Sequence, residues 1–394
     1  MYMMAPFFFT YIVYAVISPY LPILFRGLGY SPSVIGVLLG VFEGAGIVGP
    51  FIFGYFADKI GRYKPGLIIT NCLVLIVALP LALFRNPVIS ALFAIVIGLG
   101  FRSALPLLEA VTTIALGKNG DYGKIRTTGS VSFILMTLFF QSALVLPLTN
   151  PLNIAIWTSV STALAMISMV FIPPAYERTR SRTAGTAKPA GNYAGSRAGT
   201  SGKRGIWSPL LVIGLIIMAM NRLGMAPVNS FFSLFLTESM QWNAVGFMWA
   251  LASIAEVPFM FLSRRIINRF GAFNCLAFSV MALILRLLLY ALFPTKTGVI
   301  IAQLLHSFCF GLFHPSAVTF ISNCVPPERR ALGMSLYLSL GSGLPTFLGN
   351  ILGGFIVEHA GYRALYSVFA IFPLIGVGIY GITLLTLNSR DRMA

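Results

Sequence analysis

The stretch GYFADKIGRYKP, residues 54–65, places four charged side chains in a short gap between two long apolar runs. Such a density of charge is unusual in a chain that is 57% hydrophobic and only 9% charged. An average soluble domain carries about 25% charged residues, and the mean hydropathy of this chain is +0.88. The gap therefore indicates a polar loop that joins two membrane-spanning helices.

Apolar stretches of about 20 residues recur along the whole chain, and each is long enough to cross a bilayer as a helix. The backbone inside hydrocarbon must be helical or closed into a barrel, and these runs are too long and too continuously apolar for barrel strands. The sequence therefore predicts an all-α membrane protein with twelve transmembrane helices. The predicted spans are 5–25, 33–56, 66–84, 88–117, 126–147, 152–174, 207–236, 243–263, 273–293, 298–324, 332–357 and 362–386.

The distribution of Lys and Arg predicts the orientation. Most of the 27 basic residues fall at the termini and on the connections that follow even-numbered spans. The opposite connections carry only Arg26, Arg85, Lys296 and Arg363. Because cytoplasmic loops are the ones enriched in Lys and Arg, we expect a multi-pass protein of the cell (inner) membrane with both termini in the cytoplasm. This bias also accounts for the net charge of +17 without a nucleic-acid partner.

A long connection divides the chain near its middle. Residues 175–206 are rich in Gly, Ala, Ser, Thr, Arg and Lys and contain nothing that can build a core, so they are interpreted as a basic cytoplasmic linker. Six predicted spans precede it (1–174) and six follow it (207–394). The two parts resemble each other: Phe25 aligns with Phe235, Gly36 with Gly246, and PFIFGYFADKIG with PFMFLSRRIINRFG. Such a repeat predicts two pseudo-symmetric six-helix bundles, an arrangement associated with transporters.

With the spans and the repeat in place, the opening stretch resembles the loop signature of the major facilitator superfamily, roughly GxxxDxxGRxxx. Gly54, Asp58, Gly61 and Arg62 stand at its defined positions. The resemblance implies the major facilitator fold and assigns Asp58, Gly61 and Arg62 to a latch that closes the cytoplasmic face. The alternative is a positively charged loop with a glycine turn.

Ionisable residues inside the membrane cost roughly 2.5–3.5 kcal/mol each on insertion scales, so they usually have a partner or a function. Glu109 lies in the fourth predicted span, Arg126 opens the fifth, and Phe133 follows two turns later on the same face. Here the chain resembles the lactose permease and phenylpropionate permease branch of the superfamily. The resemblance implies that Glu109 and Arg126 hydrogen-bond the substrate and that Phe133 stacks on its ring. A structural ion pair between neighbouring helices is the alternative.

A second group of ionisable residues lies in the second half. Arg286 and His306 have the spacing of an Arg and a His in the lactose permease, where the His belongs to the coupling network. Three residues after His306 this chain has Cys309, where that permease carries its proton-binding glutamate. Glu256 and Glu43 are therefore the candidate proton carriers, and His306 as a packing residue is the alternative. The coupling ion is expected to be a proton, with sodium or no ion still open.

Asn221 and Arg222 complete the predicted substrate-binding residues. Arg222 lies in the first helix of the second half, where the lactose permease has an acid. It is expected either to pair with Glu256 on the next helix or to attract an anionic substrate; the sequence leaves both open.

These features predict a secondary active transporter rather than an enzyme. No GxSxG or HExxH motif is present, and His306 and His314 are about 12 Å apart along a helix, too far for one metal ion. We expect no cofactor and a monomer. The resemblance implies proton-coupled import of a small polar solute by alternating access, with a sugar-like solute first. An aromatic acid or nucleoside symporter, or a drug/proton antiporter, is the alternative.

Overall fold

The computed structural model describes residues 2–116, 122–142, 147–173 and 207–391, which are almost entirely helical and contain no strand. The predicted all-α class is therefore confirmed. The predicted linker, 175–206, lies outside the described residues, so the proposed domain boundaries stay predictions.

Within the described residues, each predicted span overlaps one or more helices. Within the described ranges, nine helices are long and apolar enough to cross a membrane, or ten with the bent pair Val245–Phe259 and Phe261–Phe270. One of the nine, Leu332–Thr386, is 55 residues long and covers two predicted spans. A span total of twelve stays a prediction.

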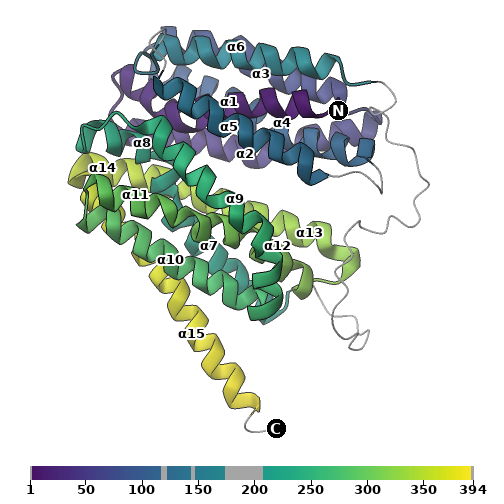
Figure 1. The fold of residues 1–394 in the computed structure, drawn as a ribbon, viewed down its shortest axis with the longest axis vertical. Helices are drawn as coiled ribbons and strands as arrows, with labels where there is room; N and C mark the ends of the chain where they lie inside the picture. The colour runs from purple at the N-terminus through teal and green to yellow at the C-terminus, as the bar shows by residue number, and fades with distance from the viewer. Residues whose placement is uncertain (1, 117–121, 143–146, 174–206, 392–394) are drawn as a thin grey trace.

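The first half consists of regular helices: α1 (Met4–Gly27), α2 (Pro32–Ile60), α3 (Lys64–Leu83), α4 (Pro87–Leu116), α5 (Tyr122–Ser142) and α6 (Pro151–Val170). Prolines at the first turns of α2, α3 and α6 suit helix starts, where the missing N–H has no partner to lose. Figure 1 shows these helices gathered in the upper group, which we call the N-bundle.

The second half is less regular. Its α-helices are α7 (Pro209–Ser230), α8 (Phe232–Leu234), α9 (Val245–Phe270), α10 (Ala272–Leu292), α11 (Lys296–Leu304), α12 (Phe313–Cys324), α13 (Arg330–Leu336), α14 (Leu344–Phe369) and α15 (Ile371–Asp391). A short 3₁₀ turn, η4 (Pro327–Arg329), precedes α13. The π-helical segments η2 (Phe235–Ser239), η3 (Ser307–Leu312) and η5 (Tyr337–Gly343) interrupt the predicted continuous spans. Wide π turns often occur at functional sites. These helices form the lower group in Figure 1, the C-bundle.

Hydrogen bonds join the two bundles at the end where α1 stops and α2 begins, which we call the Arg26 end. Arg26 Nε donates to Glu238 Oε1 over 2.5 Å. Glu358 Oε2 accepts from Ser31 Oγ over 2.7 Å and from the backbone N–H of Ser33 over 2.8 Å. The side chains at this end therefore hold the bundles against each other.

Glycines let the bundles approach closely at the same end. A Cβ on Gly36 of α2 would lie 2.5 Å from the carbonyl oxygen of Asn350 and 2.9 Å from Cα of Gly354. A Cβ on Gly246 of α9 would lie 2.2 Å from the carbonyl oxygen of Thr137. Backbone therefore packs on backbone at two inter-bundle seams, α2 with α14 and α5 with α9, and neither has room for a side chain.

The opposite end contains the turn that the opening sequence stretch forms, and we call it the Asp58 end. Gly61 ends α2 with φ 71°, a left-handed conformation that glycine adopts without a Cβ clash. Tyr63 donates its hydroxyl to Asp58 Oδ1 over 2.6 Å. Burial, together with this bond to Asp58, raises the pKa of the Tyr63 phenol. Asp58 is thus hydrogen-bonded within its own bundle here, and its latch role stays a prediction.

Candidate functional site

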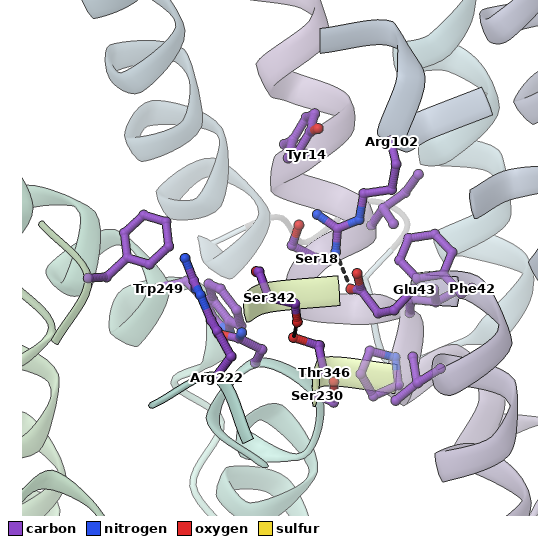
Figure 2. Close-up of a pocket in the computed structure, with 16 residues that line it drawn as sticks. Tyr14, Ser18, Phe42, Glu43, Arg102, Arg222, Ser230, Trp249, Ser342 and Thr346 are labelled. Atoms are coloured by element: carbon purple, nitrogen blue, oxygen red, sulfur yellow. Dashed lines mark hydrogen bonds and ion pairs between the residues drawn. The ribbon is translucent and has the colours of Figure 1, made fainter. Parts of the chain in front are cut away.

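A cavity of about 340 Å³ lies between the two bundles. Helices α1, α2 and α4 of the N-bundle line one side, and α7, α9, η3, η5 and α14 of the C-bundle line the other. Three charged side chains line it: Glu43, Arg102 and Arg222. Figure 2 shows Glu43 and Arg102 on one side, Arg222 on the other, and Ser342 and Thr346 between them.

On the N-bundle side, Arg102 of α4 donates from Nη2 to the Glu43 carboxylate of α2. The guanidinium carbon also lies 5.3 Å from the ring centre of Phe42 and 5.5 Å from that of Phe101. Gly46 makes room for this arginine, because a Cβ there would lie 2.6 Å from its Cγ. The opposite charges of Arg102 and Glu43 compensate each other, so this pair adds no net charge to the cavity lining.

We expect Arg102→Met and Glu43→Gln each to lower the free energy of unfolding by up to about 3 kcal/mol, because each leaves a partly buried charge without its counter-charge. The double variant should recover most of that loss, since neither charge remains. Thermal unfolding of the four proteins in one detergent measures the coupling. Additive losses would show that the two side chains act independently.

On the C-bundle side, Arg222 of α7 lies between two aromatic rings. Its guanidinium carbon is 5.1 Å from the ring centre of Phe310 and 5.2 Å from that of Phe313. Nη2 donates to the Tyr337 hydroxyl over a long 3.4 Å, and the buried Nε has no hydrogen-bond partner. Of the two expectations for Arg222, pairing with Glu256 is not what the structure shows, because no ion pair joins them among the described residues.

Glu256 of α9 instead faces His306, with Oε2 3.9 Å from Nε2. Arg286 of α10 donates from Nη1 to Nδ1 of the same ring over 2.9 Å. Because arginine can only donate, Nδ1 must accept, so the neutral ring carries its proton on Nε2, facing the carboxylate. The arrangement presents a hydrogen-bond donor to a carboxylate that has no arginine or lysine ion-pair partner within the described residues.

Arg286 itself is almost completely buried, with 1% of its surface exposed. Its other donors reach Gln303 Oε1 at 2.5 Å, Tyr290 Oη at 3.2 Å and Met225 Sδ at 3.7 Å. The structure therefore brings together Arg286, His306 and Glu256, all three predicted to act in coupling. Glu43, the fourth residue predicted to act in coupling, does not belong to this group and pairs with Arg102 instead.

The predicted Glu109–Arg126 contact is present, with Arg126 Nε 3.5 Å from Glu109 Oε1. The Arg126 guanidinium carbon also lies 4.9 Å from the ring centre of Tyr11. Phe133 is half-buried and packs against the hydrophobic core of the N-bundle. None of these three residues lines the central cavity in this conformation.

Asn221 is fully buried beside Arg222 in sequence but does not line the cavity, and neither amide atom has a hydrogen-bond partner. Several cavity residues were not predicted from the sequence. They are Tyr14, Ser18, Phe42, Trp249, Phe310, Ser342 and Thr346. Serines, threonines and aromatic residues occur throughout the spans, so their composition alone gave no signal.

The MFS_1 like family matches residues 1–368. The "Probable 3-phenylpropionic acid transporter" of Escherichia coli (strain K12) is 24% identical over 373 residues, 91% of this chain and 92% of that protein. "Maltose permease" of Geobacillus stearothermophilus is 29% identical over 167 residues, 42% of this chain and 41% of that protein. The chain spans about two fifths of the length of the first two curated relatives that it matches.

Among solved structures, the nucleoside transporter NupG superposes with a TM-score of 0.79. Its sequence is 17% identical, and the alignment covers 97% of this chain and 98% of that one. This likeness concerns the fold alone. It extends over nearly the whole chain and confirms the predicted major facilitator fold.

Proposed function

Because the chain belongs to the MFS_1 like family, a family of membrane transporters, we propose that it is a proton-coupled symporter that imports a small polar organic solute by alternating access. Relatives named for a sugar, an aromatic acid and nucleosides support a small organic solute. The central cavity is the proposed binding site. The hydroxyls of Ser18, Ser342 and Thr346 suit a hydroxylated, sugar-like solute.

The observation that carries proton coupling is the environment of Glu256. Glu43 and Glu109, the other two glutamates of the predicted spans, each have an arginine partner. Among the described residues, the one ion-pair contact of Glu256 is with His306, 3.9 Å away, and three quarters of its side chain is buried. The positive charge of Arg126 also acts on it, without forming an ion pair. A carboxylate in that setting gains and loses a proton more readily than one held ionised by an arginine. We therefore assign proton binding to Glu256, with His306 and Arg286 orienting its surroundings.

Alternating access requires one end of the cavity to be closed while the other is open. The contacts of Arg26 with Glu238 and of Ser31 with Glu358 support a closed Arg26 end. The bias of Lys and Arg supports placing that end outside the cell and both termini in the cytoplasm of a bacterial inner membrane. We therefore propose an inward-facing state of a monomeric carrier, with solute and lipid bilayer as its partners.

The test is uptake by proteoliposomes of labelled maltose, 3-phenylpropionate and uridine, each with an inward-directed proton gradient. At least one compound should accumulate above its outside concentration, and a protonophore should abolish that accumulation. Maltose binding without uptake would indicate a sensor instead. Equilibration that ignores the gradient would contradict proton coupling, and sodium would then be tested.

The Asp58 end must close when the Arg26 end opens, and we assign that latch to Asp58, Gly61 and Arg62. Asp58→Asn should slow uptake severalfold while leaving solute affinity unchanged, because it weakens only the outward-facing state. Tyr63→Phe is the matched control, since it removes the local hydrogen bond to Asp58 and keeps the carboxylate. Equal slowing in both variants would reduce the role of Asp58 to local stability of the turn.

A further inference from the structure

The cavity carries one charge that the protein does not compensate. Among the described intramembrane arginines, Arg102 pairs with Glu43 and Arg126 with Glu109. Arg286 has no carboxylate partner, but four neutral groups occupy its donors and it is sealed from the cavity. Arg222 differs from all three, because it lines the cavity without a carboxylate and with most of its donors unused.

The geometry around Arg222 suits the binding of an anion. A guanidinium has five N–H donors in a planar fork, and among the described residues only the 3.4 Å bond to Tyr337 uses one. The side chain is nevertheless 92% buried, since 8% of its surface is exposed. The rings of Phe310 and Phe313 contact the guanidinium. Burying a cation in this way is unfavourable unless an anion joins it.

We propose that the transported solute is a small organic carboxylate, whose carboxylate binds the Arg222 guanidinium in the central cavity. Planar carboxylates match the arginine fork through two parallel hydrogen bonds. The fixed Glu43–Arg102 pair adds no net charge, so the empty cavity presents one positive charge to the solute. This inference rests on the proposed transport function and specifies the substrate class for the same site.

The rest of the cavity indicates the body of that solute. Trp249 supplies aromatic surface on the Arg222 side of the cavity and Phe42 on the Glu43 side, and Ser18, Ser342 and Thr346 supply hydroxyls. A cavity of about 340 Å³ is at the small end of the range for ligand pockets. Hydroxylated acids of sugar size and arylalkanoic acids both fit this description, and they share the carboxylate that the proposal requires.

The first test needs no ligand. Arg222→Met should raise the Tm of the empty protein in detergent, because it replaces an uncompensated buried cation with an apolar chain of similar length. Arg363→Met, which removes an exposed arginine from the same bundle, is the matched control and should leave Tm unchanged. A lower Tm for Arg222→Met would overturn the proposal, since it would show that the arginine stabilises the fold itself.

The second test measures binding without any gradient, using carboxylates with neutral counterparts: 3-phenylpropionate with 3-phenylpropanol, and gluconate with glucitol. At least one acid should bind at least about tenfold more tightly than its alcohol, and Arg222→Met should remove that preference while Arg222→Lys retains part of it. Binding of an alcohol as tight as its acid would overturn the carboxylate class but leave proton-coupled transport standing. Carboxylate binding without gradient-driven uptake would contradict proton-coupled transport but leave the carboxylate class standing. If none of the four compounds binds, the change in Tm caused by Arg222→Met decides whether the proposal stands.

Discussion

Glu256→Gln is expected to abolish accumulation of solute and to leave exchange of labelled for unlabelled solute intact. Glutamine imitates the protonated carboxyl, so the loaded carrier still changes conformation. It cannot release a proton, so the empty carrier no longer returns in the form that net uptake requires. Proteoliposomes with equal solute on both sides measure exchange, and the same vesicles with solute outside measure net uptake.

The Glu43→Gln variant distinguishes a specific loss of proton coupling from the general effect of removing a charged side chain from the membrane. Glu43 is paired with Arg102, so its substitution should lower stability and affect both modes of transport together. If Glu256→Gln still accumulated solute against a proton gradient, the assignment of the proton to Glu256 would be wrong. His306→Gln would then be the next variant to measure.

Gly36→Leu should lock the carrier open at the Arg26 end and reduce uptake to background. The added side chain meets backbone atoms, the Asn350 carbonyl oxygen at 2.5 Å and Gly354 Cα at 2.9 Å, and backbone in a packed helix pair cannot move aside locally. Spin labels at Val88 and Phe293, exposed positions at the Arg26 end of each bundle, should report a longer distance than in the unsubstituted protein.

Gly378→Leu is the matched control, because a Cβ at Gly378 of α15 meets nothing within 4 Å. It should leave both the label distance and the uptake unchanged. An unaltered distance in Gly36→Leu would mean that α2 and α14 can separate by sliding without opening the Arg26 end, which would contradict a seam that gates access.

Hydropathy and the glycine turn predicted the architecture well, because both act locally. The apolar length of a span follows from bilayer thickness, and Gly61 adopts the left-handed conformation that ends α2. The π-helical segments were not predicted: Ser307–Leu312 lies within a stretch that was expected to be one continuous helix. Its wide turns depend on packing against neighbouring helices, which hydropathy does not contain.

Charge alone singled out several residues of the candidate site in the sequence, whereas their arrangement in space could not be read from it. Arg286, His306 and Glu256 were noticed because ionisable groups are rare in membrane spans, and the structure places them together. It was harder to predict which charged side chains pair with each other. Whether Arg222 meets Glu256 depends on the rotation of α7 and α9 about their axes. The rotations of α9 and α5 likewise decide that Trp249 lines the cavity and Phe133 does not.

The uncompensated charge of Arg222 has an electrical consequence for the transport cycle. In the carrier without solute, the charges of Arg222 and an ionised Glu256 sum to zero. In the loaded carrier, the carboxylate of the solute neutralises Arg222 and one proton neutralises Glu256, so the sum is again zero. Neither half of a cycle with one proton per solute then moves net charge, so membrane voltage does no work on it. Accumulation would be limited to about tenfold per unit of pH difference. A neutral solute carried with one proton would add about 2.3 kcal/mol per 100 mV.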